Sequence, residues 1–544
     1  MRNCTSKVPL VFLFAIPGFA QVPYQSLLNA QKTPQNWLTY SGSYMSQRFS
    51  GLKEITPANA KDLEVKWVFQ GRSFDKFEST PLVADGVMYV SEPPDDVVAL
   101  DARTGRMFWI YEHRVPNDVR VCCGRVNRGV ALLNDAVYIN TLDCQLIALD
   151  AKTGNEIWKT QVCNYKDGYA LASAPLALKD KIVVGTAGGE FGIRGYLAAY
   201  DAQTGHEEWR FYTIPDAGKP GNETWQGETW KTGGGSLWVT GSYDPELNLI
   251  YWGTGNPGPD WNPDARPGDN LYTDCAIALD ADTGQLKWHF QFTPHDEWDF
   301  DAVQVPVLAD MNWNGQPRKL ILWGNRNGFF YVLDRVNGSF LLGKPFVKQT
   351  WAKGVDDHGR PVKVPGMAPT ERGTLVYPGV QGGTNWFSAS FNPLTSLFYV
   401  LGWEDYWTVY YAEKTPYVAG ERFQGGAVRY IVAPSRRAEP DLRPANTGYG
   451  ALKAIDPQTG NAVWEFKMKE VSESGILNTA ANVLFSGTRA GHFYALDSRS
   501  GKLLWRRYLG GQIAASPMTY EVDGHQFVVV ISGNSLFTIG LREP

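Results

Sequence analysis

The sequence predicts an all-β fold in which one short unit, repeated along the chain, stacks into a ring. Three observations carry this prediction. The 544 residues include 56 glycines, 20 tryptophans and 26 tyrosines, a composition that suits many short strands joined by tight turns and packed through aromatic rings. One strand–turn–strand motif recurs over most of the chain. No long stripe of apolar residues shows the 3.6-residue period of a helix.

The repeated motif begins at Ala99-Leu-Asp-Ala-Arg-Thr-Gly105 and ends at Trp109. An apolar pair ends one strand, the Asp accepts hydrogen bonds from amides of the turn, and the Gly takes a positive φ. We expect the next strand to deliver its Trp back into the same sheet. The other copies are Ala148–Trp158, Ala199–Trp209, Ala278–Trp288, Ala454–Trp464, Ala495–Trp505 and Val332–Gly338, of which the last lacks the Trp.

The spacing of the copies predicts a β-propeller. Several successive copies begin about 40 to 55 residues apart, which is the period of one blade. A single blade cannot bury both of its faces, whereas a closed ring of blades does so. Two wider gaps contain the variant turns Tyr243–Tyr251 and Phe391–Tyr399, so the repeats alone predict seven to nine blades. Residues 415–444 lack clear alternation and are expected to form an excursion loop, and no linker divides residues 21–544, which we predict to be one domain.

Residues 1–20 have the pattern of a secretory signal peptide. Arg2 and Lys7 are positive, residues 8–16 are mostly apolar, and small residues precede a cleavage site after Ala20. An ordinary apolar strand is the alternative. No later segment reaches the roughly 18 apolar residues that would suggest a membrane span. The net charge of −5 and the lack of a basic run argue against nucleic acid as a partner.

The cysteines are interpreted in the light of export, because an exported protein can keep disulfides. We predict the bridges Cys122–Cys123 and Cys144–Cys163, and a buried thiol at Cys275. A bridge between sequence neighbours is unusual and such features cluster at functional sites, although two reduced structural cysteines are the alternative. The chain has no Cys-x-x-Cys-His motif, so it carries no covalently attached haem.

The strongest signal for a site is the acidic stretch from Thr293 to Asp301. On an extended backbone Asp299 and Asp301 point the same way, and carboxylates that close raise each other's pKa unless a cation lies between them. Glu190 after Gly188-Gly189, and Asn256 in a Gly-rich turn, add oxygen donors that suit a hard cation better than zinc or copper. A solvated acidic loop and an ordinary turn asparagine are the alternatives.

Other residues suit a flat, anionic ligand. Arg128 and Arg326 carry guanidinium groups that bind carboxylates with two parallel hydrogen bonds. Trp238, after three glycines, offers a flat ring, although packing in the core is the default role of any single tryptophan.

Together these motifs resemble one family. Cys-Cys-x-x-x-Asn-Arg-Gly, Gly-Gly-Glu-Phe-Gly, Gly-Thr-Gly-Asn-Pro, Arg-Pro-Gly-Asp-Asn and Thr-Pro-His-Asp-Glu-Trp-Asp are similar to motifs of the pyrroloquinoline quinone (PQQ)-dependent alcohol dehydrogenases, the methanol/ethanol dehydrogenase family of quinoproteins. The resemblance extends from Trp37 through Trp505 to Tyr520. It implies an eight-bladed propeller with tryptophan-docking repeats.

The resemblance also implies roles for individual residues. Trp238 would form the floor under PQQ, and the Cys122–Cys123 ring would cover its other face. Arg326 would bond the reactive quinone oxygens, and Asp299 would be the general base. The residues around the cofactor's carboxylates and carbonyls would be Glu78, Arg128, Gly188, Gly189, Asn385 and Trp386, and the metal ligands would be Glu190, Asn256 and Asp299.

The resemblance bears on the metal as well. Calcium-dependent relatives usually have a small residue two positions after the catalytic Asp, whereas lanthanide-dependent relatives have a second Asp there and tend to have Gly before the metal-binding Glu. This chain has Asp301 and Gly189, and a trivalent ion rewards an extra carboxylate, so a lanthanide is favoured and calcium is the alternative. The chain departs from the family at Ala172, Ala187 and Glu473, which affects the lining of the cofactor pocket.

The function that the resemblance implies is oxidation of a primary alcohol to an aldehyde in the periplasm. Because the chain lacks a haem motif, the electrons would pass to a separate cytochrome c. The alternatives are a sugar or polyol dehydrogenase and a non-catalytic propeller scaffold. A homodimer is left open.

Overall fold

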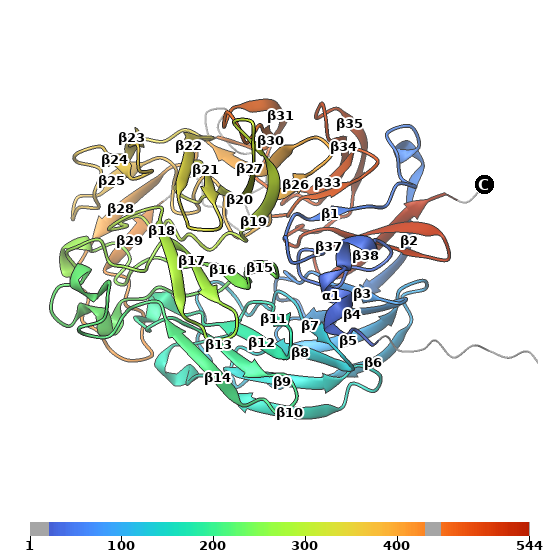
Figure 1. Ribbon diagram of the computed structural model, residues 1–544, viewed down its shortest axis with the longest axis horizontal. Coiled ribbons are helices and arrows are strands. Elements are labelled where there is room, and N and C mark those ends of the chain that lie inside the picture. The colour runs from blue at the N-terminus through green and yellow to red at the C-terminus, as the bar shows by residue number, and fades with distance from the viewer. Residues whose placement is uncertain (1–20, 430–447, 543–544) are drawn as a thin grey trace, which may run out of the picture.

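The structure is a computed structural model that describes residues 21–429 and 448–542, so the predicted signal peptide lies outside the described residues. The strands form eight sheets of four or five strands, arranged as blades around a common centre (Figure 1). This confirms the all-β propeller, and the eight sheets match the eight blades that the resemblance implies.

The first four blades are β3–β6 (Leu82–Ala84, Val87–Glu92, Asp96–Asp101, Met107–Tyr111), β7–β10 (Ala131–Leu133, Ala136–Asn140, Gln145–Asp150, Glu156–Gln161), β11–β14 (Leu176–Leu178, Lys181–Gly185, Tyr196–Asp201, Glu207–Tyr212) and β15–β18 (Ser242–Asp244, Leu249–Gly253, Cys275–Asp280, Leu286–Gln291). The next three are β19–β22 (Val307–Trp313, Gln316–Gly324, Phe329–Asp334, Phe340–Pro345), β26, β27, β30 and β31 (Ser390–Asn392, Leu397–Glu404, Tyr449–Ile455, Ala462–Met468) and β1 with β32–β35 (Phe49–Ser50, Leu477–Thr479, Val483–Gly487, His492–Asp497, Leu503–Tyr508).

The last blade closes the ring with strands from both ends of the chain. β36–β38 (Met518–Val522, His525–Ser532, Ser535–Leu541) come from the C-terminal end, and β2 (Leu63–Gln70) pairs antiparallel with β38 as the outermost strand. Because this blade takes its fourth strand from the start of the chain, it needs no copy of the repeated turn. Closure of this kind leaves no long sheet edge between the first and last blades.

The repeated turn has the predicted hydrogen bonds and glycine conformation, and the tryptophan side chain contacts the next blade. In the first copy, Asp101 Oδ1 accepts hydrogen bonds from the amides of Arg103 and Thr104, and Gly105 has a φ of 74°. Trp109 lies on β6, which pairs with β5 of its own sheet as expected, but its side chain contacts the next blade. Its Nε1 donates to the carbonyl of Ala151 in the next blade, 3.0 Å away, and its ring lies against Gly154, where a Cβ would stand 2.5 Å from the ring. The tryptophans therefore join neighbouring blades.

The two variant turns are not additional blades. Tyr243–Tyr251 forms the turn between β15 and β16, and Phe391–Tyr399 forms the turn between β26 and β27. Each precedes a standard turn within the same blade, so the upper end of the predicted range of seven to nine blades is wrong. The seven standard turns and the blade closed by β2 account for all eight sheets.

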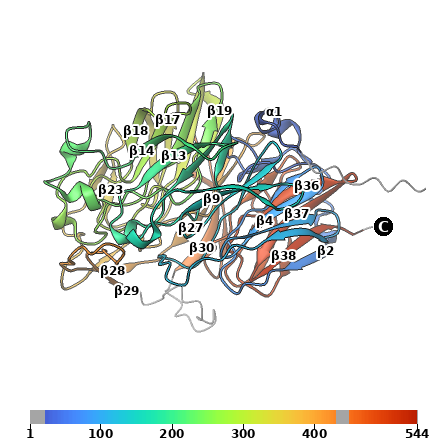
Figure 2. The ribbon, with the colours of Figure 1, turned by 90° about the horizontal axis from the view of Figure 1, so that it is seen from below.

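Short helices and two small sheets lie outside the eight blades. Among the described residues the only α-helix is α1 (Tyr24–Leu28), and the 3₁₀ turns are η1 (Ala30–Lys32), η2 (Ala60–Asp62), η3 (Tyr165–Asp167), η4 (Gly189–Phe191), η5 (Asn222–Thr224), η6 (Thr229–Thr232) and η7 (Pro263–Ala265). Two small sheets contain β23 (Ala352–Val355) with β24 (Pro361–Lys363), and β25 (Thr374–Val376) with β28 (Thr408–Ala412) and β29 (Gly426–Arg429). Figure 2 shows α1 at one face of the ring and β28 with β29 at the other.

The predicted excursion loop is partly a strand. Residues 413–425 connect β28 to β29, which pairs with β28, and the part of the prediction that falls on residues 430–444 lies outside the described residues. No helix in the described ranges is long and apolar enough to cross a membrane. The structure joins Cys122 to Cys123 and Cys144 to Cys163 and leaves Cys275 as a buried thiol, as predicted.

Candidate active site

The predicted site residues lie in connections at one end of their blades. Arg128 and Trp238 precede the innermost strands β7 and β15, whereas Glu190, Asn256 and Arg326 lie between the second and third strands of three successive blades. Because neighbouring strands of a blade are antiparallel, the start of the first strand and the end of the second lie at the same end of the sheet. The Asp-to-Gly turns join the third and fourth strands and lie at the opposite face.

Arg326 is the centre of an acidic cluster. Its Nη1 is 2.5 Å from Asp301 Oδ2 and its Nη2 is 3.0 Å from Asp299 Oδ2. Its Nε and Nη2 also donate to the carbonyl of Val380. Burial alone lowers the pKa of Arg326, but the two aspartates more than reverse this effect and raise it above its usual value. The guanidinium is therefore a fixed positive charge between two carboxylates.

The carboxylates of this cluster interact with one another across blades. Burial raises the pKa of Asp299 well above its usual value, and the negative charges of Asp301, Asp260 and Glu190 raise it further. Burial and the charge of Asp301 raise the pKa of Glu190 as well. Arg326 opposes the shift of Asp299 without cancelling it, as expected where like charges outnumber the cation between them.

The acidic oxygens are near one another without meeting at one point. Among the described residues, the only three Cys, His or acidic side chains with ligand atoms within 4.8 Å of one another are Cys122, Cys123 and Glu190. The two sulfurs are bonded to each other, so neither is a thiolate ligand. This grouping shows instead that the paired cysteines lie directly beside Glu190.

Asn256 is fixed by three neighbours. Its backbone N–H donates to Asp301 Oδ1 over 2.8 Å, and its Nδ2 donates to Asp260 Oδ1 over 3.0 Å. Its Oδ1 faces Gly189, since a Cβ on Gly189 would lie 3.7 Å from that oxygen. Gly188 permits this approach: its φ is 115°, and a Cβ there would lie 2.1 Å from the carbonyl oxygen of Gly168. The structure thus brings the side-chain oxygen of Asn256 toward the Gly-Gly-Glu turn.

Asp260 belongs to the cluster but was missed by sequence reasoning. Its side chain is buried, and burial together with the charge of Glu190 raises its pKa to about 8. It lies between Pro259 and Trp261, and neither neighbour is a polar group that would mark a site. Its position four residues after Asn256, in the same connection, was the available signal.

A second group of residues lies around Arg128. The guanidinium carbon is 5.0 Å from the ring centroid of Trp238 and 4.7 Å from that of Trp386. Arg128 Nη2 is 2.8 Å from Glu78 Oε2, and its buried Nε has no hydrogen-bond partner among the described residues. The backbone N–H of Trp386 donates to Asn385 Oδ1. A buried guanidinium with an unused donor between two indoles suits a flat ligand that carries carboxylates.

Glu473, one of the departures from the family pattern, is not an unpaired charge. Its carboxylate lies 2.9 Å from Lys76 and 3.2 Å from Arg489, and accepts a hydrogen bond of 2.6 Å from Gln512. Lys76 also lies 2.7 Å from Glu78. An ion-pair chain therefore runs from Glu473 through Lys76 and Glu78 to Arg128, and the sequence had not indicated Lys76.

The acidic cluster around Arg326 and the group around Arg128 come together at Asp301 and at Glu190. A hydrogen bond with the Trp238 side chain is one of the influences that lower the pKa of Asp301, which burial raises overall. Carboxylates and an amide oxygen fit a hard cation, and the arginines with the two tryptophans fit a planar polycarboxylate. The residues present therefore fit a metal ion next to a flat, acidic cofactor.

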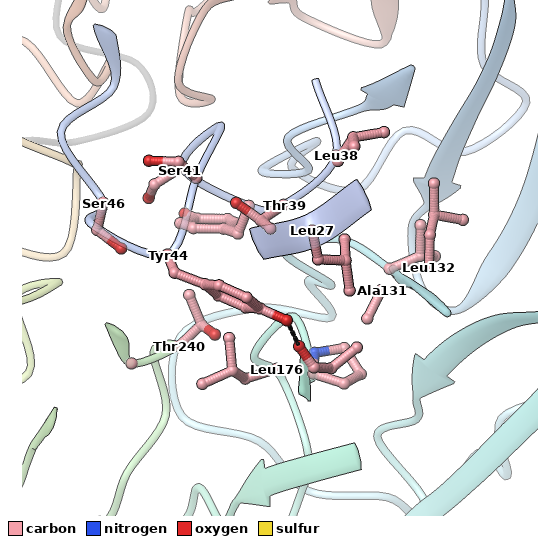
Figure 3. A pocket seen from close by; sticks show the side chains of 16 residues that line it. Leu27, Leu38, Thr39, Ser41, Tyr44, Ser46, Ala131, Leu132, Leu176 and Thr240 are labelled. Carbon is pink, nitrogen blue, oxygen red and sulfur yellow. Dashed lines mark hydrogen bonds between the residues drawn. The ribbon is translucent and has the colours of Figure 1, made fainter. Parts of the chain in front are cut away.

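One cavity lies apart from this cluster. It is lined by uncharged side chains of α1, of residues 38–46 and of the inner strands β7 and β11, and Tyr44 donates to the carbonyl of Ala177 within it (Figure 3). No predicted site residue lines it. Leu27 of α1 contributes to its wall, and no charged side chain lines it.

Comparison with known proteins agrees with this geometry. The family model described as PQQ glucose/ethanol/alcohol dehydrogenase, β-propeller domain, matches residues 37–348 and 346–528. The chain is 38% identical to the quinoprotein alcohol dehydrogenase PedH of Pseudomonas putida over 97% of this chain and 91% of that protein. It is 41% identical to the quinohemoprotein alcohol dehydrogenase ADH IIB of the same species over 91% of this chain and 73% of that protein.

A solved structure supports the same relationship in three dimensions. A europium-containing methanol dehydrogenase superimposes with a TM-score of 0.88 at 33% identity, covering 95% of this chain and all of that chain. Each of these proteins is a relative of similar length or greater, so the likeness extends over the whole ring.

Proposed function

The chain belongs to the PQQ-dependent glucose/ethanol/alcohol dehydrogenase β-propeller family, and from that premise we propose that it oxidises a primary alcohol to an aldehyde with bound PQQ and one metal ion. One observation carries this proposal. Asp299 and Asp301 pair with Arg326, the charges of Glu190 and Asp260 act on Asp299, and an arginine between two tryptophans lies in the same region. A non-catalytic scaffold does not account for so many buried charges at one place.

The metal would be held by Glu190, Asn256, Asp299 and Asp301. A lanthanide suits this set better than calcium, because several carboxylates against one guanidinium leave an excess of negative charge that a trivalent ion offsets more fully. The europium in the related methanol dehydrogenase supports this choice. PQQ would lie on Trp238 beneath the Cys122–Cys123 ring, with its polar groups near Glu78, Arg128, Gly188, Gly189, Asn385 and Trp386.

When bound, PQQ supplies an ortho-quinone that accepts the hydride of the alcohol, and the metal supplies Lewis acidity. Asp299 takes the proton from the substrate hydroxyl at its carboxylate oxygen. Its raised pKa makes it a stronger proton acceptor than a solvated aspartate once it is ionised. Arg326, fixed by Asp301 and by the Val380 carbonyl, keeps a positive charge next to Asp299 throughout.

The proposed function also indicates the electron acceptor and the cellular compartment. The electrons pass to a separate cytochrome c in the periplasm, consistent with the chain's lack of a haem-attachment motif. Light scattering of the purified protein distinguishes a monomer from the homodimer that the sequence leaves open.

The test is a dye-linked assay of apoprotein supplied with PQQ and either La³⁺ or Ca²⁺. We expect the wild type to oxidise primary alcohols, and Asp299→Asn to lose about 10²- to 10⁴-fold in turnover while remaining folded. Asp357→Asn, at an exposed aspartate in the β23–β24 turn, is the matched control and should keep full activity. Full turnover by Asp299→Asn would refute its role as the base, and glucose oxidation without alcohol oxidation would favour a sugar dehydrogenase.

A further inference from the structure

Asp260 has an arrangement that the proposed mechanism does not use. Its side chain is buried, and the backbone around it is clamped by Arg266, whose Nε and Nη2 donate to the carbonyls of Pro259 and Asp260. The carboxylate itself is bonded only by amides among the described residues: Oδ1 accepts from Asn256 Nδ2 and Oδ2 accepts from Gln424 Nε2, both over 3.0 Å. It is a buried acidic group with no hydrogen-bonded cation.

The bond to Asn256 determines which way that amide points. An ionised carboxylate only accepts hydrogen bonds, whereas the two ends of an asparagine amide are a donor and an acceptor. When a bound cation keeps Asp260 ionised, the carboxylate therefore selects the orientation in which Nδ2 of Asn256 faces Asp260 and Oδ1 faces the opposite direction, toward Gly189 and the Glu190 turn. Without that acceptor, only the long 3.5 Å contact from Asn256 Nδ2 to the carbonyl of Pro257 distinguishes the two orientations.

The other oxygen of Asp260 is bonded to the connection between β28 and β29. Gln424 donates to Oδ2, and its backbone carbonyl accepts from Trp261 N–H over 2.9 Å. One residue earlier, the N–H of Phe423 donates to the carbonyl of Glu190 over 2.7 Å. The same connection thus holds both the Asp260 turn and the Glu190 turn, and fixes their relative positions.

Asp260 also adds negative charge where the proposed cation would lie. Glu190 is its strongest charged neighbour, followed by Asp301, and its own charge acts on Asp299. With Asp260 the cluster contains four acidic residues, Glu190, Asp260, Asp299 and Asp301, against the guanidinium of Arg326. Arg422 and Arg266 also act on Glu190 and Asp260, and each ionised carboxylate still attracts a trivalent ion more strongly than a divalent ion.

We propose that Asp260 is a positioning residue of the metal site, which turns the side-chain oxygen of Asn256 toward the cation and selects trivalent over divalent ions. This inference rests on the proposed function, because it requires a cation bound near Glu190, Asn256 and Asp299. The inference concerns the orientation of one metal ligand and the charge around the metal. Both can be tested by measuring metal binding, without measuring turnover.

The experiment uses apoprotein and Tb³⁺ as the probe. Tryptophan-sensitised Tb³⁺ emission reports binding, competition with La³⁺ and Ca²⁺ gives both affinities, and emission lifetimes in H₂O and D₂O count the waters on the ion. Asp260→Asn keeps the shape and removes the charge. Asp264→Asn, at an exposed aspartate in the same connection, is the matched control. Asp260→Ser gives a second test of the same direction if Asp260→Asn proves unstable in thermal unfolding.

We expect Asp260→Asn to weaken La³⁺ binding by about 10- to 100-fold, the usual effect of losing a partner that orients a metal ligand. Ca²⁺ binding should weaken by a smaller factor, and bound Tb³⁺ should gain a water as Asn256 loses its orientation, whereas Asp264→Asn should behave as the wild type. Equal losses for both ions, or unchanged affinities and hydration, would overturn the inference while wild-type binding and alcohol oxidation leave the proposed function standing. If the wild type binds neither ion, the proposed function fails and the role of Asp260 fails with it.

Discussion

Replacing Asp301 by alanine tests whether the second carboxylate of the acidic stretch selects the metal. Asp301 Oδ2 pairs with Arg326 Nη1 over 2.5 Å, and Oδ1 accepts from the N–H of Asn256 over 2.8 Å. Arg326 keeps Asp299 and the Val380 carbonyl as partners, so the guanidinium is not left unpaired. The orphaned Asn256 N–H costs about 1 to 3 kcal/mol of folding free energy, and because Arg326 stays paired the total loss should stay below the roughly 3 to 5 kcal/mol of an uncompensated buried charge.

The effect on metal binding scales with the charge of the ion. One unit of charge at about 4 Å from a carboxylate, at an effective dielectric constant near 20, contributes about 4 kcal/mol. A trivalent ion therefore loses more than a divalent ion when Asp301 is removed, by up to about three orders of magnitude in the ratio of affinities. The assay is titration of Asp301→Ala apoprotein with La³⁺ and Ca²⁺ at saturating PQQ, by dye-linked activity and by Tb³⁺ displacement. Equal losses with both ions would refute the charge argument, and the wild type titrated in parallel is the control.

Three further perturbations test the fold and the electrostatics. Trp288→Ala should lower the free energy of unfolding by about 3 to 5 kcal/mol in thermal or denaturant unfolding. The reason is that the Trp288 ring covers Gly338 and its Nε1 donates to the Arg335 carbonyl. Trp288→Leu should lower it by less, and equal losses for the two variants would contradict a packing role. Removing the Cys144–Cys163 bridge, which joins residues 19 apart, should lower stability by about 3 kcal/mol in non-reducing unfolding measurements, and a reducing agent should abolish the difference from the wild type. Because the pKa of Asp260 is raised to about 8 without a cation, this group keeps its proton in the folded protein between its usual pKa and that value. The cation-free protein should therefore lose stability as the pH rises through this window. Calorimetry should show tighter La³⁺ binding, and fewer protons released on binding, at about pH 8 than at about pH 6. Affinity that falls with rising pH would contradict it.

The fold was predictable because its information is local and repeated. Each copy of the turn carries its own Asp, Gly and Trp, so the copies indicate both the strands and the period of the blades. The destination of the tryptophan was not predictable from one copy, since the distance from Trp109 to Gly154 depends on how blades stack. Closure of the ring by β2 was also not predictable from the sequence. The strand Leu63–Gln70 lacks the repeated motif and pairs with a strand at the other end of the chain.

The site was predictable only as far as its residues carry motifs. Asp299, Asp301, Glu190 and Asn256 lie in distinctive Gly-rich or acidic stretches, and the structure places them in connections at one face of the ring. Their roles in binding metal and cofactor remain predictions. Lys76 and Asp260 were missed although each lies near a predicted site residue, because their significance comes from partners far away in the chain, Glu473 and Gln424.

The shape of the ring explains how so many acidic groups are kept together. Carboxylates that raise one another's pKa favour separation, so the energy that holds them close must come from elsewhere. It comes from the blades, whose inner strands are buried and whose tryptophans join neighbouring sheets far from the acidic face. The connections that bear Glu190, Asn256 and Arg326 are anchored by those sheets, so the cluster cannot relax by spreading apart. A cation relieves this repulsion, and because Asp301 contacts Arg326 and interacts with Trp238, the relief reaches the cofactor side of the site. Any coupling between metal and PQQ binding acts by the same factor in both directions, whichever binds first.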